Sequence, residues 1–361
     1  MNSERIGQMK IYEKSQYQED IRYTAELDLP WEKLTGRSIM ISGATGLIGS
    51  FLVDVLMYRN LHAEMNCTVY ALGRNEARAR ERFAYCADRS FYRFISYDIN
   101  LPFVRDEIGD VDYILHMASN THPVAYATDP IGTITTNIIG TQNMLEFAAA
   151  HKAKRSAFTS SNEIYGENRG DVEKFDEQYC GYIDCNTMRA GYPESKRCGE
   201  ALCQAYIRQK GLDIVIPRLT RSYGPTLLKS DTKALTQFLH KAVAGEDIVL
   251  KSAGTQYYSY LYVADTVSGL LTVLLKGETG EAYNIADDAS DIMLKDLAAM
   301  IAGYVGRKVI FEIPDEVESA GYSRATKARL DSTKLRSLGW TAGYDIRSGI
   351  ERTIDMMKEQ G

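Results

Sequence analysis

Ser38-Ile39-Met40-Ile41-Ser42-Gly43-Ala44-Thr45-Gly46-Leu47-Ile48-Gly49 is the stretch that decides the fold, and an apolar segment continues from it. The first part is typical of a short buried strand, and the end is typical of a long helix. Glycines between a strand and a helix permit a tight turn, a close approach of backbone to a pyrophosphate, and close packing of the two elements. The N-terminus of the helix offers unpaired N–H groups and a positive dipole end to phosphates. We therefore expect a dinucleotide-binding turn rather than a glycine-rich loop without a ligand, with these binding residues: Gly43, Thr45, Gly46, Leu47, Ile48 and Gly49.

Apolar strands alternate with helical stretches through the first two thirds of the chain. We expect strands near 38–42, 67–72, 94–98, 112–116, 155–161 and 213–218, and helices near 47–60, 75–86, 132–152 and 187–210. This alternation is the signature of a parallel sheet wound with crossover helices. The predicted fold is therefore α/β, a Rossmann-type doubly wound parallel sheet with a smaller C-terminal α/β substrate-binding region.

The chain divides into three predicted segments. Residues 1–36 are polar and charged with a few aromatic side chains, and we expect an N-terminal arm that packs on the body or on a partner subunit. Residues 37–224 are expected to form an NAD(P)-binding Rossmann domain. From about residue 225 the alternation becomes irregular, so 225–361 is expected to be mainly a substrate-binding cap region. Core elements are expected to return near 256–285, with a strand near Tyr260–Val263.

Composition excludes several classes of function. The 361 residues are 45% hydrophobic, which is ample for a large core, and the net charge of −6 argues against binding to nucleic acid. We find no apolar run of the ~18 residues needed to span a bilayer and no apolar signal segment at the start, so we expect a cytoplasmic protein without a membrane partner. The six cysteines lack Cys-x-x-Cys pairs and a matching histidine cluster, so we expect reduced thiols and no metal site.

Tyr192 and Lys196 are four residues apart in Tyr192-Pro193-Glu194-Ser195-Lys196, and a helix would place them on one face. A free phenol has a pKa of about 10, and a neighbouring cation favours the phenolate, which can accept a proton from a sugar hydroxyl. The spacing alone is also typical of a surface pair. The other motifs of the chain must decide between the two interpretations.

Several further motifs occur in a fixed order. They are Asp98-Ile99, His116-Met117-Ala118-Ser119, Asn137 with Gly140-Thr141, Ser160-Ser161-Asn162-Glu163-Ile164-Tyr165-Gly166, Arg218-Leu219-Thr220-Arg221-Ser222-Tyr223-Gly224-Pro225, Tyr262-Val263-Ala264-Asp265, Tyr283-Asn284-Ile285, Asp331 and Leu338-Gly339-Trp340. With the glycine turn and the Tyr192/Lys196 pair, this set resembles the extended short-chain dehydrogenase/reductase family from about Gly43 to Trp340. It resembles in particular the branch of NAD-dependent nucleotide-sugar epimerases, dehydratases and decarboxylases.

The resemblance implies a role for each matching residue. Tyr192 takes a proton from a sugar hydroxyl, usually at C4, as hydride passes to the nicotinamide, and Lys196 lowers the tyrosine pKa and bonds the cofactor ribose. Ser161 bonds the same hydroxyl and helps to hold charge on the developing oxyanion. The cofactor-binding set implied by the resemblance adds to the glycine turn the residues Asp98, Ile99, Met117, Ala118, Ser119, Tyr192 and Lys196.

The residues after Ser161 favour one fate of the 4-keto intermediate. The 4,6-dehydratases carry an Asp-Glu pair here, whereas this chain has Asn162-Glu163, and a carboxamide cannot deliver a proton as an acid near neutral pH. Decarboxylation needs no such acid. The site resembles that of the decarboxylases that act on nucleotide-linked glucuronic acid, as does Met188-Arg189-Ala190-Gly191-Tyr192. We therefore favour a UDP-glucuronate decarboxylase-like lyase, with a 4-epimerase as the first alternative and a 4,6-dehydratase-like enzyme as another.

The chain departs from the family pattern at the residues expected to bind the nucleotide-sugar diphosphate. Arg221 replaces the usual asparagine, and Tyr258 replaces the usual arginine. A guanidinium can fork onto phosphate oxygens, so Arg221 could supply the missing charge. Asn162, Arg221, Tyr258 and Arg329 are our candidate substrate-binding residues, and Lys229 and Lys233 are further cationic candidates.

Cofactor choice depends on the end of the second strand. NAD-dependent members carry an acidic residue there to bond the ribose 2′-hydroxyl, but this chain reads Leu72-Gly73-Arg74-Asn75. Arg74 could meet a 2′-phosphate instead, which favours NADP on local grounds. Enzymes that oxidise and re-reduce one sugar within a turnover usually hold NAD, and we therefore expect NAD.

Two further expectations concern class and assembly. A cofactor-binding regulatory or structural subunit would keep the fold without turnover, but the joint presence of Tyr192, Lys196, Ser161 and Glu163 favours an enzyme. Family members commonly pair through two helices, and the apolar run along 132–150 with the helix after Tyr192 could serve, so we expect a homodimer.

Overall fold

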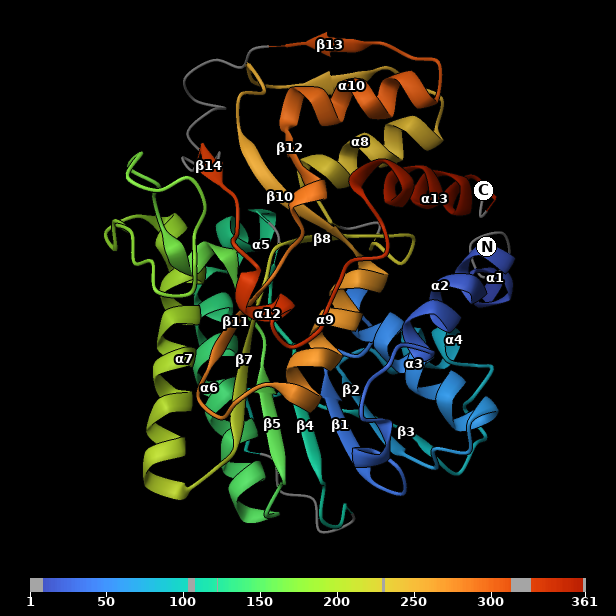
Figure 1. Cartoon of the computed structure of the whole chain (residues 1–361), viewed down its shortest axis with the longest axis vertical. Helices are drawn as coiled ribbons and strands as arrows, with labels where there is room; N and C mark the ends of the chain where they lie inside the picture. Colours follow the sequence, from blue (N-terminus) through green and yellow to red (C-terminus); the bar gives the residue numbers. More distant parts are fainter. Residues whose placement is uncertain (1–8, 103–107, 122, 229–230, 313–325, 360–361) are drawn as a thin grey trace.

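A parallel sheet forms the centre of the computed structural model, which describes residues 9–102, 108–121, 123–228, 231–312 and 326–359 (Figure 1). Its strands are β1 (Ser38–Ser42), β2 (Thr68–Gly73), β3 (Tyr92–Ser96), β4 (Tyr113–His116), β5 (Arg155–Phe158), β6 (Ser160–Ser161), β7 (Ile214–Leu219) and β11 (Ala282–Ile285). Their order is β11-β7-β5-β4-β1-β2-β3, with β6 paired to β7, and all pairings are parallel. The predicted Rossmann-type sheet is confirmed.

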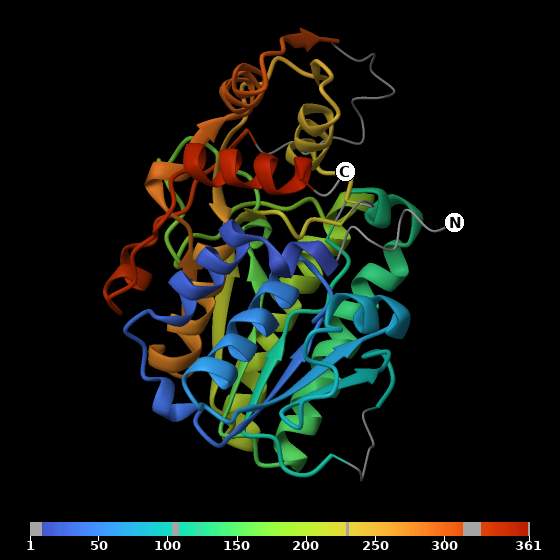
Figure 2. The same ribbon diagram turned by 90° about the vertical axis from the view of Figure 1, so that its right-hand side faces the viewer.

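Helices cover both faces of this sheet (Figures 1 and 2). On one face lie α2 (Ser15–Ala25), α3 (Leu47–His62) and α9 (Val263–Lys276), and on the other lie α6 (Pro130–Ala150) and α7 (Gly191–Lys210). Successive residues of a strand point to opposite faces. Accordingly Ile39 and Ile41 of β1 belong to the apolar cluster of the first face, and Met40 belongs to that of the second. Burial on both faces explains why the strands read as continuous apolar runs.

Several predicted elements have different ends in the structure. β3 begins at Tyr92 rather than near 94, and α4 (Glu76–Arg82) stops short of residue 86. The strand expected over 155–161 is interrupted at Thr159, whose N–H and hydroxyl both donate to the His116 carbonyl, at 3.1 and 2.9 Å. This break leaves the Thr159 carbonyl free to accept a bond from elsewhere.

A second, smaller sheet lies beyond the carboxyl ends of the main strands (Figure 1). It consists of β8 (Arg221–Tyr223), β10 (Tyr257–Tyr262), β12 (Asp291–Met293) and β14 (Lys327–Ala328), with β10 at its centre. The strand expected near Tyr260–Val263 is therefore present as β10, but it pairs within this sheet. The strand of the 256–285 segment that returns to the main sheet is β11, which pairs with β7.

The remaining elements are short or lie around the second sheet. They are α1 (Met9–Glu13), η1 (Trp31–Lys33), α5 (Pro123–Thr128), η2 (Asn162–Tyr165), η3 (Met188–Ala190), α8 (Ala234–Val243), β9 (Ile248–Leu250), η4 (Asp288–Ser290), α10 (Leu294–Tyr304), β13 (Val309–Phe311), α12 (Thr333–Arg336) and α13 (Ile346–Lys358). Within the described ranges, we find no helix with both the length and the apolar character needed to cross a membrane.

The N-terminal helix α2 packs on the body of the protein through two buried carboxylates. Tyr17 of α2 donates to Asp54 of α3 at 2.6 Å, and the buried Arg82 of α4 forms an ion pair with the same carboxylate. One turn along α2, Asp20 accepts hydrogen bonds from Tyr262 at 2.5 Å and Tyr344 at 2.8 Å. Arg352 of α13 completes this second group with an ion pair to Asp20 at 2.8 Å. Helix α2 therefore joins the cofactor-binding region to the C-terminal region.

The ends of β1 and β4 are tied together by a buried side-chain pair. Ser42 Oγ accepts the N–H groups of Met117 and Ala118, at 3.0 and 3.1 Å, so its own proton is directed to His116 Nδ1 at 2.8 Å. His116 is buried, and burial together with the nearby Lys196 ammonium lowers the pKa of its imidazole to about 3. The imidazole is therefore neutral at physiological pH and acts as an acceptor for Ser42.

Asp54→Ala is expected to lower the free energy of unfolding by about 3–5 kcal/mol, because the buried Arg82 would lose its carboxylate partner. Urea unfolding followed by circular dichroism measures this change. The matched control is Glu76→Ala, which removes the exposed pair with Arg80 and should cost less than about 1 kcal/mol. Equal losses in the two variants would contradict a structural role for the Asp54 group.

His116 should make the stability of the fold depend on pH. An unfolded histidine binds a proton near pH 6.5, whereas the folded imidazole stays neutral down to about pH 3, so stability falls as the pH drops through that window. Between pH 7 and pH 5 we expect the free energy of unfolding to fall by roughly 2 kcal/mol more in the wild type than in His116→Asn. Urea unfolding at both pH values measures the difference, and identical pH dependence in the two proteins would contradict the assignment.

Candidate active site

The glycine turn between β1 and α3 has a backbone that side chains would block. Gly43 has φ +75°, and a Cβ there would lie 3.0 Å from the backbone nitrogen of Ala118. A Cβ at Gly49 would lie 2.3 Å from the Gly43 carbonyl oxygen, so α3 can pack on the turn only with glycine at this position. Helix α3 begins at Leu47 with Gly46 as its N-cap, and no side chain caps it. Thr45, Leu47 and Ile48 are partly exposed beside this uncapped end, which fits a pyrophosphate.

The loops after β3 and β4 flank the glycine turn. The Asp98 carboxylate accepts the backbone and side-chain N–H groups of Asn100, both at 3.0 Å. Ile99 is buried under Gly140 of α6, where a Cβ would lie 2.7 Å from its methyl group. Arg74, at the end of β2, is exposed to solvent. All the predicted cofactor positions outside α7 therefore lie at or just beyond the carboxyl ends of β1 to β4.

A chain of buried hydrogen bonds connects this cofactor edge to helix α7. Ser119 donates to Asn137 of α6 at 2.7 Å, and the Asn137 amide donates to Ser195 at 2.9 Å. The Ser195 hydroxyl in turn donates to the backbone carbonyl of Tyr192 at 2.9 Å. Asn137 is fully buried, so the chain fixes the start of α7 against the loop after β4.

Tyr192, Ser161 and Glu163 come together at the start of α7. Tyr192 is 7% exposed, and Ser161, at the end of β6, acts on its phenol to lower the phenol pKa. Ser161 Oγ also accepts the N–H of Glu163 at 3.2 Å, which begins the short helix η2. Burial and the nearby Glu163 carboxylate raise the pKa of the Tyr192 phenol above its ordinary value, against the opposing effects of Ser161 and Arg189. The phenol is therefore protonated in the substrate-free protein.

Lys196 lies one turn along α7 from Tyr192, but its ammonium forms its hydrogen bond with the sheet. Its Nζ donates to the Thr159 carbonyl at 2.8 Å, the group left open by the break between β5 and β6. The side chain is 2% exposed, and burial lowers the pKa of Lys196 to about 7, although Cys203 and Glu200 act in the opposite direction. The expected lowering of the Tyr192 pKa by Lys196 is thus not seen in this state, because burial disfavours both charged forms.

Two residues that the sequence did not single out complete the site. Arg189 of η3 binds both carboxylate oxygens of Glu163 through Nη2, at 2.8 and 2.7 Å. Its guanidinium lies over the ring of Tyr126 from α5, 4.8 Å from the ring centroid. The Tyr126 ring is stacked on Tyr192, with centroids 5.0 Å apart. Arg189 stood within a stretch that resembled the decarboxylases, whereas nothing in the local sequence distinguished Tyr126.

The predicted substrate residues fall into two groups. Asn162 is buried next to Ser161, and Arg221 of β8 lies over the ring of Tyr258 of β10, 3.6 Å from its centroid. Arg221 Nη1 is buried and has no hydrogen-bond partner in the part of the chain that the structure describes. The altered pair Arg221 and Tyr258 is therefore one stacked unit with an N–H group to spare.

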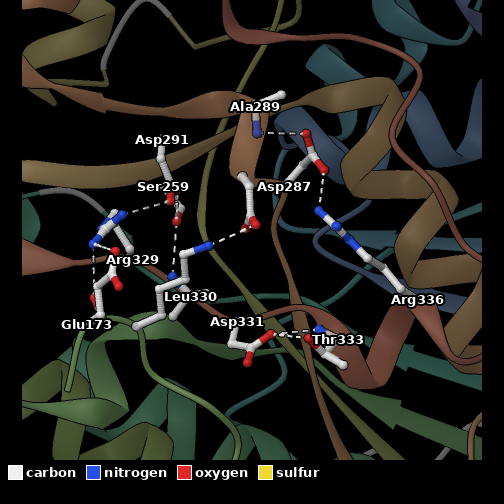
Figure 3. A network of polar contacts seen from close by, with 12 residues as sticks. Glu173, Ser259, Asp287, Ala289, Asp291, Arg329, Leu330, Asp331, Thr333 and Arg336 are labelled. Carbon is white, nitrogen blue, oxygen red and sulfur yellow. Dashed lines mark hydrogen bonds and ion pairs between the residues drawn. The ribbon is translucent and has the colours of Figure 1, made fainter.

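Arg329 lies within a separate group of polar side chains, next to Glu173 and Asp291 (Figure 3). It stacks on Tyr257, the neighbour of Tyr258, and neighbouring strand residues point to opposite faces. Its guanidinium pairs with Glu173 at 2.8 Å and approaches Asp291 at 3.9 Å. The structure therefore does not bring Arg329 together with Arg221. Lys233 pairs with Asp231 at 3.0 Å, and Lys229 lies outside the described residues.

The assembled groups suit proton transfer. A phenol, a serine hydroxyl and a carboxylate converge beside an anion-binding turn, which is a set suited to moving a proton to or from a hydroxyl group next to a bound dinucleotide. Across the described ranges, no three His, Cys, Asp or Glu side chains are grouped so that they could hold a metal ion.

Comparison with known proteins shows the family to which the chain belongs. Residues 39–286 match the model of the NAD dependent epimerase/dehydratase family. The chain is 31% identical to UDP-glucuronic acid decarboxylase 3 of Arabidopsis thaliana over 86% of each chain. It is 28% identical to UDP-glucuronic acid decarboxylase 1 of Xenopus tropicalis, over 90% of this chain and 73% of the relative.

Solved structures show the same fold. The UDP-glucuronic acid 4-epimerase of Bacillus cereus, in complex with UDP-glucuronic acid and NAD, matches with a TM-score of 0.73 and 22% identity, over 89% of this chain and 99% of that one. A dTDP-glucose 4,6-dehydratase from Streptomyces venezuelae with NAD bound matches with a TM-score of 0.75 and 24% identity, over 89% and 97%. Sheet order, glycine turn, the Tyr192/Lys196 pair and the family match agree, and the chain belongs to the NAD dependent epimerase/dehydratase family.

Proposed function

We propose that this protein oxidises the C4 hydroxyl of a nucleotide-linked uronic acid and then decarboxylates the 4-keto intermediate, as a UDP-glucuronate decarboxylase-like lyase. The observation that carries the proposal is the position of Glu163, held by Arg189 beside Ser161 and Tyr192. The relatives named UDP-glucuronic acid decarboxylases, matched over most of the chain, support the same reaction.

NAD is the proposed cofactor, and when bound it supplies the hydride acceptor for C4. The uncapped start of α3 and the closely packed glycines would hold its pyrophosphate. The Tyr192 phenol first passes its own proton to solvent by way of Glu163, and the phenolate then takes the proton of the C4 hydroxyl. Ser161 donates a hydrogen bond to the oxygen on which negative charge develops. Lys196 holds α7 against the sheet through its hydrogen bond to the Thr159 carbonyl. With a pKa lowered to about 7, its amine can be charged or neutral near the site.

Decarboxylation then needs little further chemistry from the protein. The C5–C6 bond breaks, CO2 leaves, the electron pair moves into the C4 ketone to form an enolate, and C5 regains a proton. Ser161 and protonated Tyr192 stabilise the enolate oxygen. Glu163 is 25% exposed and can pass a proton between solvent and the site. Water elimination lacks its acid because Asn162 replaces it, and a 4-epimerase would have no evident task for Glu163.

Arg221 is the proposed ligand for the substrate diphosphate. Its guanidinium is held in place by stacking on Tyr258, and Nη1 is buried without a hydrogen-bond partner among the residues described. A fixed planar cation with N–H groups to spare suits phosphate oxygens. Asn162 is the proposed polar contact to the sugar, and Arg329 stays a weaker candidate because Glu173 already engages it.

A homodimer formed through α6 and α7 is our further proposal. Ile131, Ile134 and Ile139 of α6 are 76%, 37% and 41% exposed, which leaves an apolar face for a second copy. The cytoplasmic location expected from the sequence stays a prediction.

Glu163→Gln should lower CO2 release from carboxyl-labelled UDP-glucuronic acid by about 100-fold or more, because the amide keeps the size of the side chain but cannot carry the proton. The matched control is Glu167→Gln, an exposed glutamate four residues away, which should keep the wild-type rate. The decarboxylase proposal is wrong if the wild type releases no CO2 while it interconverts UDP-glucose and its C4 epimer.

Tyr192→Phe separates an enzyme from a binding module of the same fold. The change removes one hydroxyl and keeps the ring that stacks on Tyr126. We expect turnover to fall by about 100-fold or more while cofactor binding is kept, because only the proton acceptor is lost. A variant with undiminished turnover would show that the phenol does not carry the chemistry.

The cofactor released from the purified protein should be NAD. Arg74 is exposed at the end of β2, where it would meet a 2′-phosphate if one were present. Mass spectrometry of the released nucleotide distinguishes the two cofactors. NADP as the main species would overturn the assignment and would give Arg74 a specific role.

A further inference from the structure

Only one of the two terminal nitrogens of the Arg189 guanidinium forms a hydrogen bond among the described residues. Nη2 binds both oxygens of Glu163, whereas Nη1 is buried and has no hydrogen-bond partner within the described ranges. A buried N–H of a cation that makes no hydrogen bond destabilises the folded state, so such groups are uncommon in native structures. Their usual explanation is a ligand, an ion or water.

The position of Arg189 is fixed by more than the ion pair. Its guanidinium lies over Tyr126, and Tyr126 is stacked on Tyr192 at 5.0 Å. Arg189 also precedes Tyr192 by three residues, in the 3-10 turn η3 that leads into α7. The cation is therefore held next to the phenol where the C4 hydroxyl reacts, and its charge acts on that phenol.

We propose that Arg189 binds the carboxylate of the uronic acid, with Glu163 holding the guanidinium in place. The inference rests on the proposed function, since it assumes that C4 of the sugar reaches Tyr192. The carboxyl carbon C6 is joined to C5, the neighbour of C4, so a sugar held at Tyr192 brings its carboxylate to this part of the site. Two carboxylates can share one guanidinium because its fork offers five N–H donors.

The charge balance explains why such a site would suit a decarboxylase. In the free protein Arg189 and Glu163 neutralise each other, and a bound uronate adds a second negative charge beside the first. Loss of neutral CO2 removes that charge and leaves the original pair. Arg189 thus attracts the carboxylate to the site, while Glu163 limits how strongly the charged ground state is held.

The test compares the binding of two nucleotide sugars that differ only at C6. Tyr192→Phe blocks turnover, and isothermal titration of this variant with UDP-glucuronic acid and with UDP-glucose gives the preference for the carboxylate. Adding Arg189→Gln should weaken the binding of UDP-glucuronic acid by about 10-fold or more and change that of UDP-glucose less than about 2-fold. Arg169→Gln in the same background is the matched control, because this exposed arginine also lies over a tyrosine, at 5.4 Å from the Tyr182 ring.

Each result decides the inference. If the uronate preference survives Arg189→Gln, or both ligands weaken equally, Arg189 does not bind the carboxylate, and the proposed function is untouched. If the parent variant shows no preference, the inference fails, whereas CO2 release by the wild type decides the function separately. Should Arg189→Gln lower the thermal midpoint, Arg189→Lys keeps the charge beside Glu163. That variant should still lose at least about 3-fold of the preference, because one ammonium cannot fork between two carboxylates.

Discussion

The hydrogen bond from the Lys196 ammonium to the Thr159 carbonyl is the interaction on which the site depends. It exists because the strand is interrupted at Thr159, between β5 and β6. The N–H and hydroxyl of Thr159 donate to the His116 carbonyl, and its own carbonyl accepts the bond from Lys196. The buried ammonium then fixes α7 against the end of β6. As a result, Tyr192 lies beside Ser161. The proton-transfer site therefore adjoins the carboxyl ends of the strands, where the glycine turn lies.

How much the sequence predicted depends on the range of the interactions involved. The glycine turn, the parallel strands and the Tyr192/Lys196 pair follow from local spacing and periodicity, and the fold was predicted correctly from them. The contact of Arg189 with Glu163 joins residues 26 positions apart, and the Tyr126 stack joins α5 to α7. No local pattern encodes such contacts. The Lys196 partner was missed for a related reason, since a strand break creates it.

Arg221 and Tyr258 show how a departure from a family pattern can be coherent. The sequence indicated that Arg221 could supply the charge missing at Tyr258, but it did not show that the two side chains are in contact. In the structure β8 and β10 are adjacent parallel strands, and the two side chains form one stack with a spare N–H group. Compared with the family pattern, the positive charge lies on β8 instead of on the neighbouring β10. The Tyr258 ring, at the position of the usual arginine, stacks on the Arg221 guanidinium. A pairing of strands far apart in the sequence was needed to see this.

The ends of the chain lie outside the segment that defines the family, which covers residues 39–286. Yet α2 and α13 share the buried carboxylate of Asp20, which Arg352 neutralises and two tyrosines bind. Neither charge can be replaced alone without leaving the other unmatched in the interior. Substitutions at these two positions should therefore arise together during evolution, so α2 and α13 would diverge from other family members together.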